Sequence, residues 1–163
     1  MKKKLLAALI LLTSTNAMAL NQWITDNKNG NPMVISEQGK LLITVAYSSS
    51  NFENIYIYPL YEDNVCKSNN YRPKQARSAK FNGVLVQLAD ACMNGAHYFY
   101  PITDQGINFV INQFFNSTSV YINQENFSEN ISAQGFSRAM STFRNMGNST
   151  GVTCSPLINT PRC

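Results

Sequence analysis

The chain has 163 residues, of which 44% are hydrophobic and 13% are charged, and its formal net charge is +4. Three of its lysines stand together at positions 2–4, and the rest of the sequence carries ten Lys/Arg residues against nine Asp/Glu residues. Binding to nucleic acid by bulk electrostatics requires clustered cations that displace counterions from phosphates. A sequence this close to neutrality argues against nucleic acid as a partner.

The first 19 residues have the three-part layout of a secretory signal peptide. A basic stub is followed by an apolar run at 5–12 and by a small, polar segment that ends in Ala17-Met18-Ala19, an A-x-A cleavage site. The apolar run is far shorter than the ~20 residues that span a membrane. We therefore expect a signal peptide at 1–19 and no membrane anchor.

Cleavage after Ala19 makes Leu20 the first residue of the exported protein. Residues 20–163 have the length of one domain, and we expect them to form a single β-rich domain. No later segment approaches the length of a transmembrane helix. The short, lysine-rich signal is typical of bacteria, so the expected location is periplasmic or secreted.

Alternation of residue type predicts short strands throughout this domain. The clearest is 54–58, which places Ile55 and Ile57 on one face and Tyr56 and Tyr58 on the other. The expected strands are 22–25, 33–36, 41–46, 54–58, 81–88, 97–100, 107–114, 120–123 and 127–132. Strands this short, separated by Gly, Asn, Pro and Ser clusters, predict an antiparallel β-sandwich or a barrel-like fold.

One helix is predicted, at 134–146, because apolar residues recur at i, i+3, i+4 and i+7. These residues are Phe136, Ala139, Met140 and Phe143. Ser132 is a candidate cap before the helix, and Gly147 is the expected stop after it. The expected fold is therefore mainly β, with one C-terminal helix that packs against the sheet and a disulfide-closed tail.

The four cysteines all follow the expected cleavage site, and an even number in an exported chain predicts disulfides. They are Cys66, Cys92, Cys154 and Cys163. Three connectivities are open, and we favour Cys66 with Cys92 and Cys154 with Cys163, because these pairs close short loops without entangling. The absence of C-x-x-C argues against a zinc site and against a thiol redox catalyst. No metal or other cofactor is expected.

Ser137 lies in Gly-Phe-Ser-Arg-Ala, which matches the nucleophile elbow G-x-S-x-G except at its last position. That elbow requires a parallel sheet and a later histidine, whereas the single histidine, His97, comes earlier in the chain. Ser137 is therefore interpreted as a residue of the first helical turn, and Gly135 as a strand-to-helix turn. A small hydrolase with Ser137 as its nucleophile stays as the alternative.

His97 shares a strand face with Phe99, and the nearest candidates for ligands, Asp90 and Asp104, are interpreted as turn residues. One histidine without converging carboxylates cannot build a zinc site. We therefore expect His97 to be a hydrogen-bonded structural residue.

The polar segment 63–79 is interpreted as a long loop tied at Cys66. Its cations and one tyrosine form the candidate binding surface, which consists of Lys67, Tyr71, Arg72, Lys74 and Arg77. Such a surface fits an acidic protein or an anionic envelope component, and the alternative is a solvated loop without a partner. Tyrosines on the solvent side of strands would fit a protein-binding or glycan-binding face, although they also pack edge strands.

Several of these features together resemble the small exported bacterial proteins of the invasion-associated locus B type. They are Trp23, the run of short strands, Cys92-Met-Asn-Gly95, and the late strand that leads into Gly135-Phe136 and Ala139. The resemblance implies a β-sandwich closed by a G-F-x-x-A helix, a role in envelope biology and host association, and no enzymatic activity. The chain departs from that family because it lacks a closely spaced cysteine pair and has a cysteine-closed tail.

The expected function is that of an exported, non-enzymatic binding protein of the bacterial envelope or host-facing surface, which contacts a protein or an envelope component. Besides the hydrolase, a structural subunit of a secretion or appendage apparatus remains an alternative. Such a subunit would add its edge strands to a neighbour.

Overall fold

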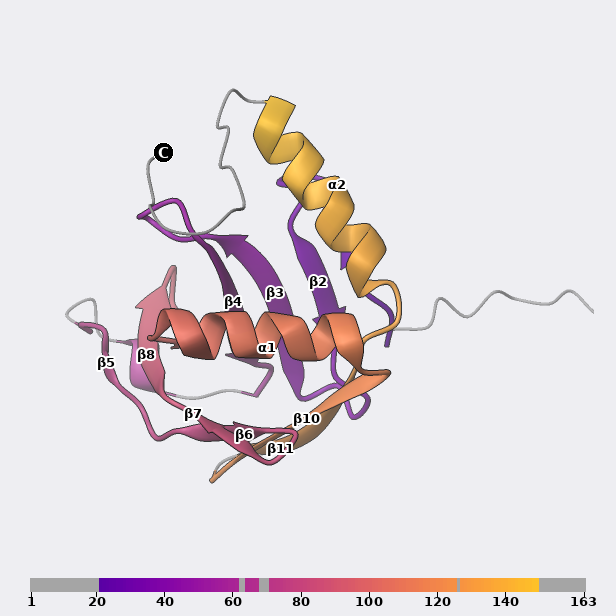
Figure 1. Ribbon diagram of the computed structural model, residues 1–163. Coiled ribbons are helices and arrows are strands. Elements are labelled where there is room, and N and C mark those ends of the chain that lie inside the picture. Colours follow the sequence, from indigo (N-terminus) through magenta and orange to yellow (C-terminus); the bar gives the residue numbers. More distant parts are fainter. Residues whose placement is uncertain (1–20, 62–63, 68–70, 126, 150–163) are drawn as a thin grey trace, which may run out of the picture.

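The computed structural model describes residues 21–61, 64–67, 71–125 and 127–149 (Figure 1). These residues form eleven strands, two α-helices and one short 3-10 helix. The strands are β1 Ile24–Thr25, β2 Pro32–Ile35, β3 Leu41–Tyr47, β4 Glu53–Pro59, β5 Lys74–Gln75, β6 Ala79–Phe81, β7 Val84–Val86, β8 Leu88–Met93, β9 Ala96–Pro101, β10 Ser119–Gln124 and β11 Phe127–Ser132. The helices are η1 Val65–Lys67, α1 Asp104–Asn116 and α2 Phe136–Ser149.

The strands form two antiparallel sheets, which confirms the expected mainly-β class. The large sheet has the order β1-β2-β3-β4-β9-β8-β5, and the small sheet has the order β11-β10-β6-β7. Within the described ranges, neither sheet closes into a barrel.

Both helices pack on the inner face of the large sheet. Helix α1 contacts β4 and β9 of the large sheet and β10 of the small sheet, and α2 contacts β1 and β2. In Figure 1, α1 crosses in front of β3 and β4, with the small sheet below it. Between these layers Trp23 meets Phe114 and Phe136, with ring centroids 5.1 and 4.7 Å away. The core therefore lies on one side of the large sheet.

The expected strand at 107–114 is wrong, because these residues belong to helix α1. Val110, Ile111 and Phe114 are buried at helical spacing, and the Thr103 side chain caps the helix by accepting a hydrogen bond from the Gly106 amide at 3.0 Å. The stretch is rich in β-branched and aromatic residues, which favour strands locally. Burial of one helical face between the two sheets overrides that local preference.

The expected single strand at 81–88 is also wrong, because a tight turn divides it. Asn82 and Gly83 have φ values of 48° and 86°, which is the two-residue hairpin geometry that Asn-Gly favours. The turn folds β7 back on β6, and β8 then begins at Leu88. Asn94-Gly95 makes the same kind of turn between β8 and β9, with φ values of 53° and 80°.

Helix α2 confirms the expected C-terminal helix and its buried face, which consists of Phe136, Ala139, Met140 and Phe143. Its predicted ends are wrong. Ser132 does not cap it, because the Ser132 hydroxyl accepts from the Gln134 amide, before the helix begins. Gly147 lies inside the helix, where a Cβ would come within 2.9 Å of the Tyr47 hydroxyl. The glycine permits close approach of Tyr47 and does not end the helix.

A disulfide joins Cys66 to Cys92, as expected, with a Cα–Cα distance of 5.6 Å. It ties η1 to β8 and so fixes one point of the long loop before β5. Cys154 and Cys163 lie outside the described residues. Within the described ranges, no helix combines the length and apolar composition needed to cross a membrane.

Candidate functional site

The outer face of the large sheet, turned away from both helices, carries four neighbouring tyrosines. Strand alternation buries Ile55 and Ile57 of β4 on the inner face and leaves Tyr56 and Tyr58 half-buried on the outer face. In β9 the same alternation buries Phe99 and turns Tyr98 and Tyr100 outward. We name Tyr56, Tyr58, Tyr98 and Tyr100 the tyrosine face.

The four rings form one contiguous cluster. Tyr98 is central, because its ring centroid lies 5.8 Å from Tyr56, 5.4 Å from Tyr58 and 5.8 Å from Tyr100. The Tyr56 and Tyr100 centroids are 6.0 Å apart. Aromatic pairs at these separations attract each other beyond the burial of their apolar area. The cluster therefore holds its rings in a defined arrangement.

The strands beside the tyrosine face continue it with uncharged residues. The register places Leu42 and Thr44 of β3 opposite Tyr58 and Tyr56, and Ala91 and Ala89 of β8 opposite Tyr98 and Tyr100. Farther out, on the same side, lie Ile24, Met33, Ile35 and Met93. None of these positions carries a charge.

Burial raises the pKa of tyrosines on this face. For Tyr56, loss of hydration is the largest cause, and together with the neighbouring Tyr98, Tyr58 and Tyr100 it raises the pKa to about 12. Burial also raises the pKa values of Tyr58 and Tyr98, and a neighbouring tyrosine adds to each shift. At neutral pH the face therefore presents aromatic area with hydroxyl groups that both donate and accept hydrogen bonds.

The structure distributes the predicted basic surface over three environments. Lys67 and Arg72 are exposed, on η1 and on the loop before β5. Tyr71 is half-buried, and the Lys74 ammonium lies 4.9 Å from the centre of its ring. Arg77 forms an ion pair with Glu125 across 2.5 Å. The structure thus brings Tyr71 and Lys74 together and pairs Arg77 with an acidic partner.

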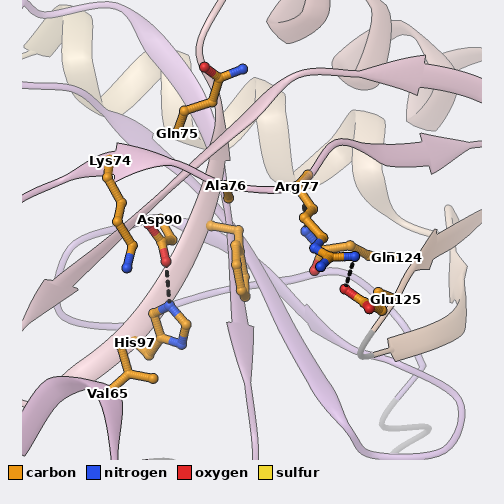
Figure 2. Close-up of a pocket in the computed structure, with 10 residues that line it drawn as sticks. Val65, Lys74, Gln75, Ala76, Arg77, Asp90, His97, Gln124 and Glu125 are labelled. Atoms are coloured by element: carbon orange, nitrogen blue, oxygen red, sulfur yellow. Dashed lines mark hydrogen bonds and ion pairs between the residues drawn. The ribbon is translucent and has the colours of Figure 1, made fainter.

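Beneath this loop lies a pocket of about 310 Å³, between the end of β10 and the inner surfaces of β8 and β9 (Figure 2). Its lining residues are Val65, Lys74, Gln75, Ala76, Arg77, Asp90, His97, Phe99, Gln124 and Glu125. The loop is held over the pocket by the disulfide and by the Tyr71 hydroxyl, which donates to Asp90 Oδ2 at 2.6 Å.

The expectation that Asp90 lies in a turn is wrong. It lies in β8 and lines the pocket. Its Oδ2 is 3.4 Å from His97 Nε2, and the residue is only 8% exposed. The His97 ring also packs on Phe99 at 4.7 Å between centroids. These contacts agree with the hydrogen-bonded structural role expected for His97, which stays a prediction. The sequence does contain a pattern that could have located Asp90. It alternates with Ala89 and Ala91, and such alternation is typical of a strand.

Two buried oxygens of the pocket residues, Asp90 Oδ1 and Gln124 Oε1, have no hydrogen-bond partner in the described part of the chain. Buried water commonly satisfies such atoms. Among the residues that the structure describes, no three His, Cys, Asp or Glu side chains come close enough to hold a metal ion.

Ser137 is exposed on the first turn of α2, as expected, and Gly135 forms the turn before it with a φ of 84°. Helix α2 contacts β1 and β2, whereas His97 lies on β9, three strands from β2 in the large sheet. At about 4.8 Å per strand, that separation is roughly 14 Å. The structure does not bring Ser137 and His97 together.

No protein-family model, no curated protein and no solved structure matches the chain. The choice of a functional surface therefore depends on the geometry and chemistry of the molecule. The tyrosine face and the Asp90 pocket are the two candidates.

Proposed function

We propose that this chain is an exported, non-enzymatic binding protein of the bacterial envelope or host-facing surface, and that it contacts a protein or an envelope component through the tyrosine face. The observation that carries the proposal is a sheet face that holds four clustered tyrosines and no charged residue. Aromatic residues are enriched and charged residues are depleted at the centres of protein interfaces.

The signal-like N-terminal sequence and the Cys66–Cys92 disulfide support an exported location, because disulfides persist in oxidising compartments. The separation of Ser137 from His97 supports a non-enzymatic role over the hydrolase alternative. Lys67 lies on η1 and Arg72 on the segment that leads to β5, and we call η1 and this segment the basic loop. Both residues are exposed and lie outside the strands of the tyrosine face, so the basic loop is the alternative surface for an acidic partner.

Affinity capture with single substitutions tests the proposal. The bait is the exported protein, recovered with its cross-linked partners and quantified by mass spectrometry. Tyr98→Lys places a charge at the centre of the tyrosine face, and we expect it to reduce partner recovery at least about tenfold, because an unpaired charge in an interface core is costly.

The matched control is Tyr121→Lys, because Tyr121 is 45% exposed on β10 of the small sheet. Each of three further variants alters a different surface: Tyr121→Lys the small sheet, Arg72→Glu the basic loop, and Ser137→Ala the first turn of α2. Loss of the partner with Arg72→Glu alone would move the binding site to the basic loop. Loss of a biological activity with Ser137→Ala, at normal abundance and melting temperature, would favour the hydrolase.

A further inference from the structure

We infer that the tyrosine face packs against the same face of a second copy of this chain, in a dimer with twofold symmetry. The inference rests on the proposed function and deepens it, because it names a second copy of the chain as the partner of the tyrosine face. Three observations carry it: the charge pattern of the face, its extent, and the chemistry of its polar groups.

The charge pattern suits contact between identical surfaces. A twofold axis places a patch against itself, so a charged residue near the axis meets the same charge on the other copy. From β1 to β8 across the large sheet, the outward strand positions flanking the tyrosine face carry no such charge. They are Ile24, Met33, Ile35, Leu42, Thr44, Ala46, Asn54, Ala89, Ala91, Met93 and Ala96.

The face approaches the size that a stable dimer needs. Six strands lie side by side from β1 to β8, and β3 and β4 are each seven residues long. At about 4.8 Å between strands and about 3.3 Å per residue, these strands outline roughly 24 by 20 Å, or roughly 500 Å² before the relief of the side chains is included. That area lies at the upper end of the apolar patches found on monomers, and with side-chain relief it approaches the ~800 Å² that each partner buries in a standard interface.

The polar groups fit a protein better than a neutral glycan. A glycan site needs side chains that bond many sugar hydroxyls, and the face carries no carboxylate and few amides. The Asn54 amide, on the same side of β4 as Tyr56, is buried and donates to the Pro101 carbonyl at 3.3 Å, and Gln75 lies at the far edge, on β5. The Thr44 hydroxyl already donates to the Pro32 carbonyl at 2.8 Å. The tyrosine hydroxyls remain, and they can donate and accept across a twofold axis.

Sedimentation velocity over a concentration series tests the dimer, with the exported protein purified with its disulfides intact. We expect twice the monomer mass at tens of micromolar concentration. Tyr98→Lys and Leu42→Lys are expected to raise the dimer dissociation constant at least about 100-fold, because each buries an unpaired charge in the interface. Tyr121→Lys is expected to leave the constant unchanged, and the melting temperatures of the separated monomers report whether each variant folds.

A wild-type protein that stays monomeric at about 1 mM overturns the dimer, as does a dimer that persists in both Tyr98→Lys and Leu42→Lys. If the wild type is monomeric but Tyr98→Lys still abolishes capture of a different protein, the proposed function stands with another partner. If neither self-association nor capture responds to Tyr98→Lys, both proposals are wrong. Retardation of the monomer by dextran in affinity electrophoresis would assign the face to a neutral glycan.

Discussion

Tyr56 shows how a single side chain reports the state of the tyrosine face. Its ring has Tyr98 and Tyr100 on the neighbouring strand, and the phenolate form would lose hydration among them. Burial is the larger cause of its raised pKa, and the neighbouring tyrosines add to it. The neutral form is therefore the one that the folded state favours.

A spectrophotometric titration at 295 nm should show this directly. In denaturant all tyrosines are expected to titrate near ~10, whereas the native protein should show an additional step near pH 12 that Tyr56→Phe removes. Because the folded-state pKa is raised, the stability that neutral Tyr56 contributes is complete below pH ~10 and is lost as the pH rises toward 12. Tyr56→Phe should therefore lose less stability than the wild type between pH 10 and 12. Full titration of the native protein by pH ~10.5 would contradict the buried state of Tyr56.

Residue patterns predicted the tyrosine face better than the pocket. Alternation alone places Tyr56 and Tyr58 opposite Ile55 and Ile57, because side chains in a strand point to alternate faces. Asp90 was misplaced because a charged residue in a strand interior is unfavourable without partners, and the partner hydroxyl of Tyr71 lies 19 residues away in the sequence. A contact of that kind depends on the folded loop.

At the scale of elements, local sequence patterns predict α2 but not α1. Helix α2 follows a glycine that its fold requires, since Gly135 has a φ of 84° and a Cβ there would lie 2.9 Å from the Trp23 carbonyl oxygen. Helix α1 has helical spacing too, but its composition favours a strand, and only the space between the two sheets decides the outcome. Long-range packing of this kind is absent from local sequence patterns.

The two faces of α2 predict opposite results for neighbouring substitutions. Phe136 is fully buried and its ring meets Trp23, Phe114 and Phe115 with centroids 4.7, 5.3 and 4.8 Å away. Phe136→Ala should therefore reduce the free energy of unfolding by ~3–5 kcal/mol. Ser137 is the next residue and is exposed, so Ser137→Ala should change the free energy of unfolding by less than ~0.5 kcal/mol. Denaturant unfolding measures both.

A loss of stability with Ser137→Ala comparable to that with Phe136→Ala would contradict this orientation of α2. The comparison is also a control for the functional test. Phe136→Ala can remove activity simply by lowering the amount of folded protein. A phenotype that follows Ser137→Ala without such depletion is the catalytic signature.

At the scale of the whole molecule, the Cys66–Cys92 disulfide connects the basic loop to the large sheet. It closes a sequence separation of 26 residues, and Tyr71 of the same loop bonds Asp90 two residues before Cys92. The sequence favours this pairing among three open connectivities, because it closes the shortest loop available to Cys66. Its consequence, a loop held over a pocket, follows only from the register of β8 and β9.

Removal of this bond predicts a loss of stability and a looser loop. In the chain-entropy estimate a closed loop of this length stabilises the fold by about 3.5 kcal/mol. The double variant Cys66→Ser, Cys92→Ser should therefore have a free energy of unfolding that is lower by about that amount, measured by denaturant unfolding. The matched variant Cys154→Ser, Cys163→Ser should lose less, because the loop that this expected pair closes is shorter. A non-reducing peptide map of the exported wild type should join Cys66 to Cys92. A map that joins Cys92 to Cys154 would contradict both pairings, and free thiols at all four cysteines would contradict an oxidising location.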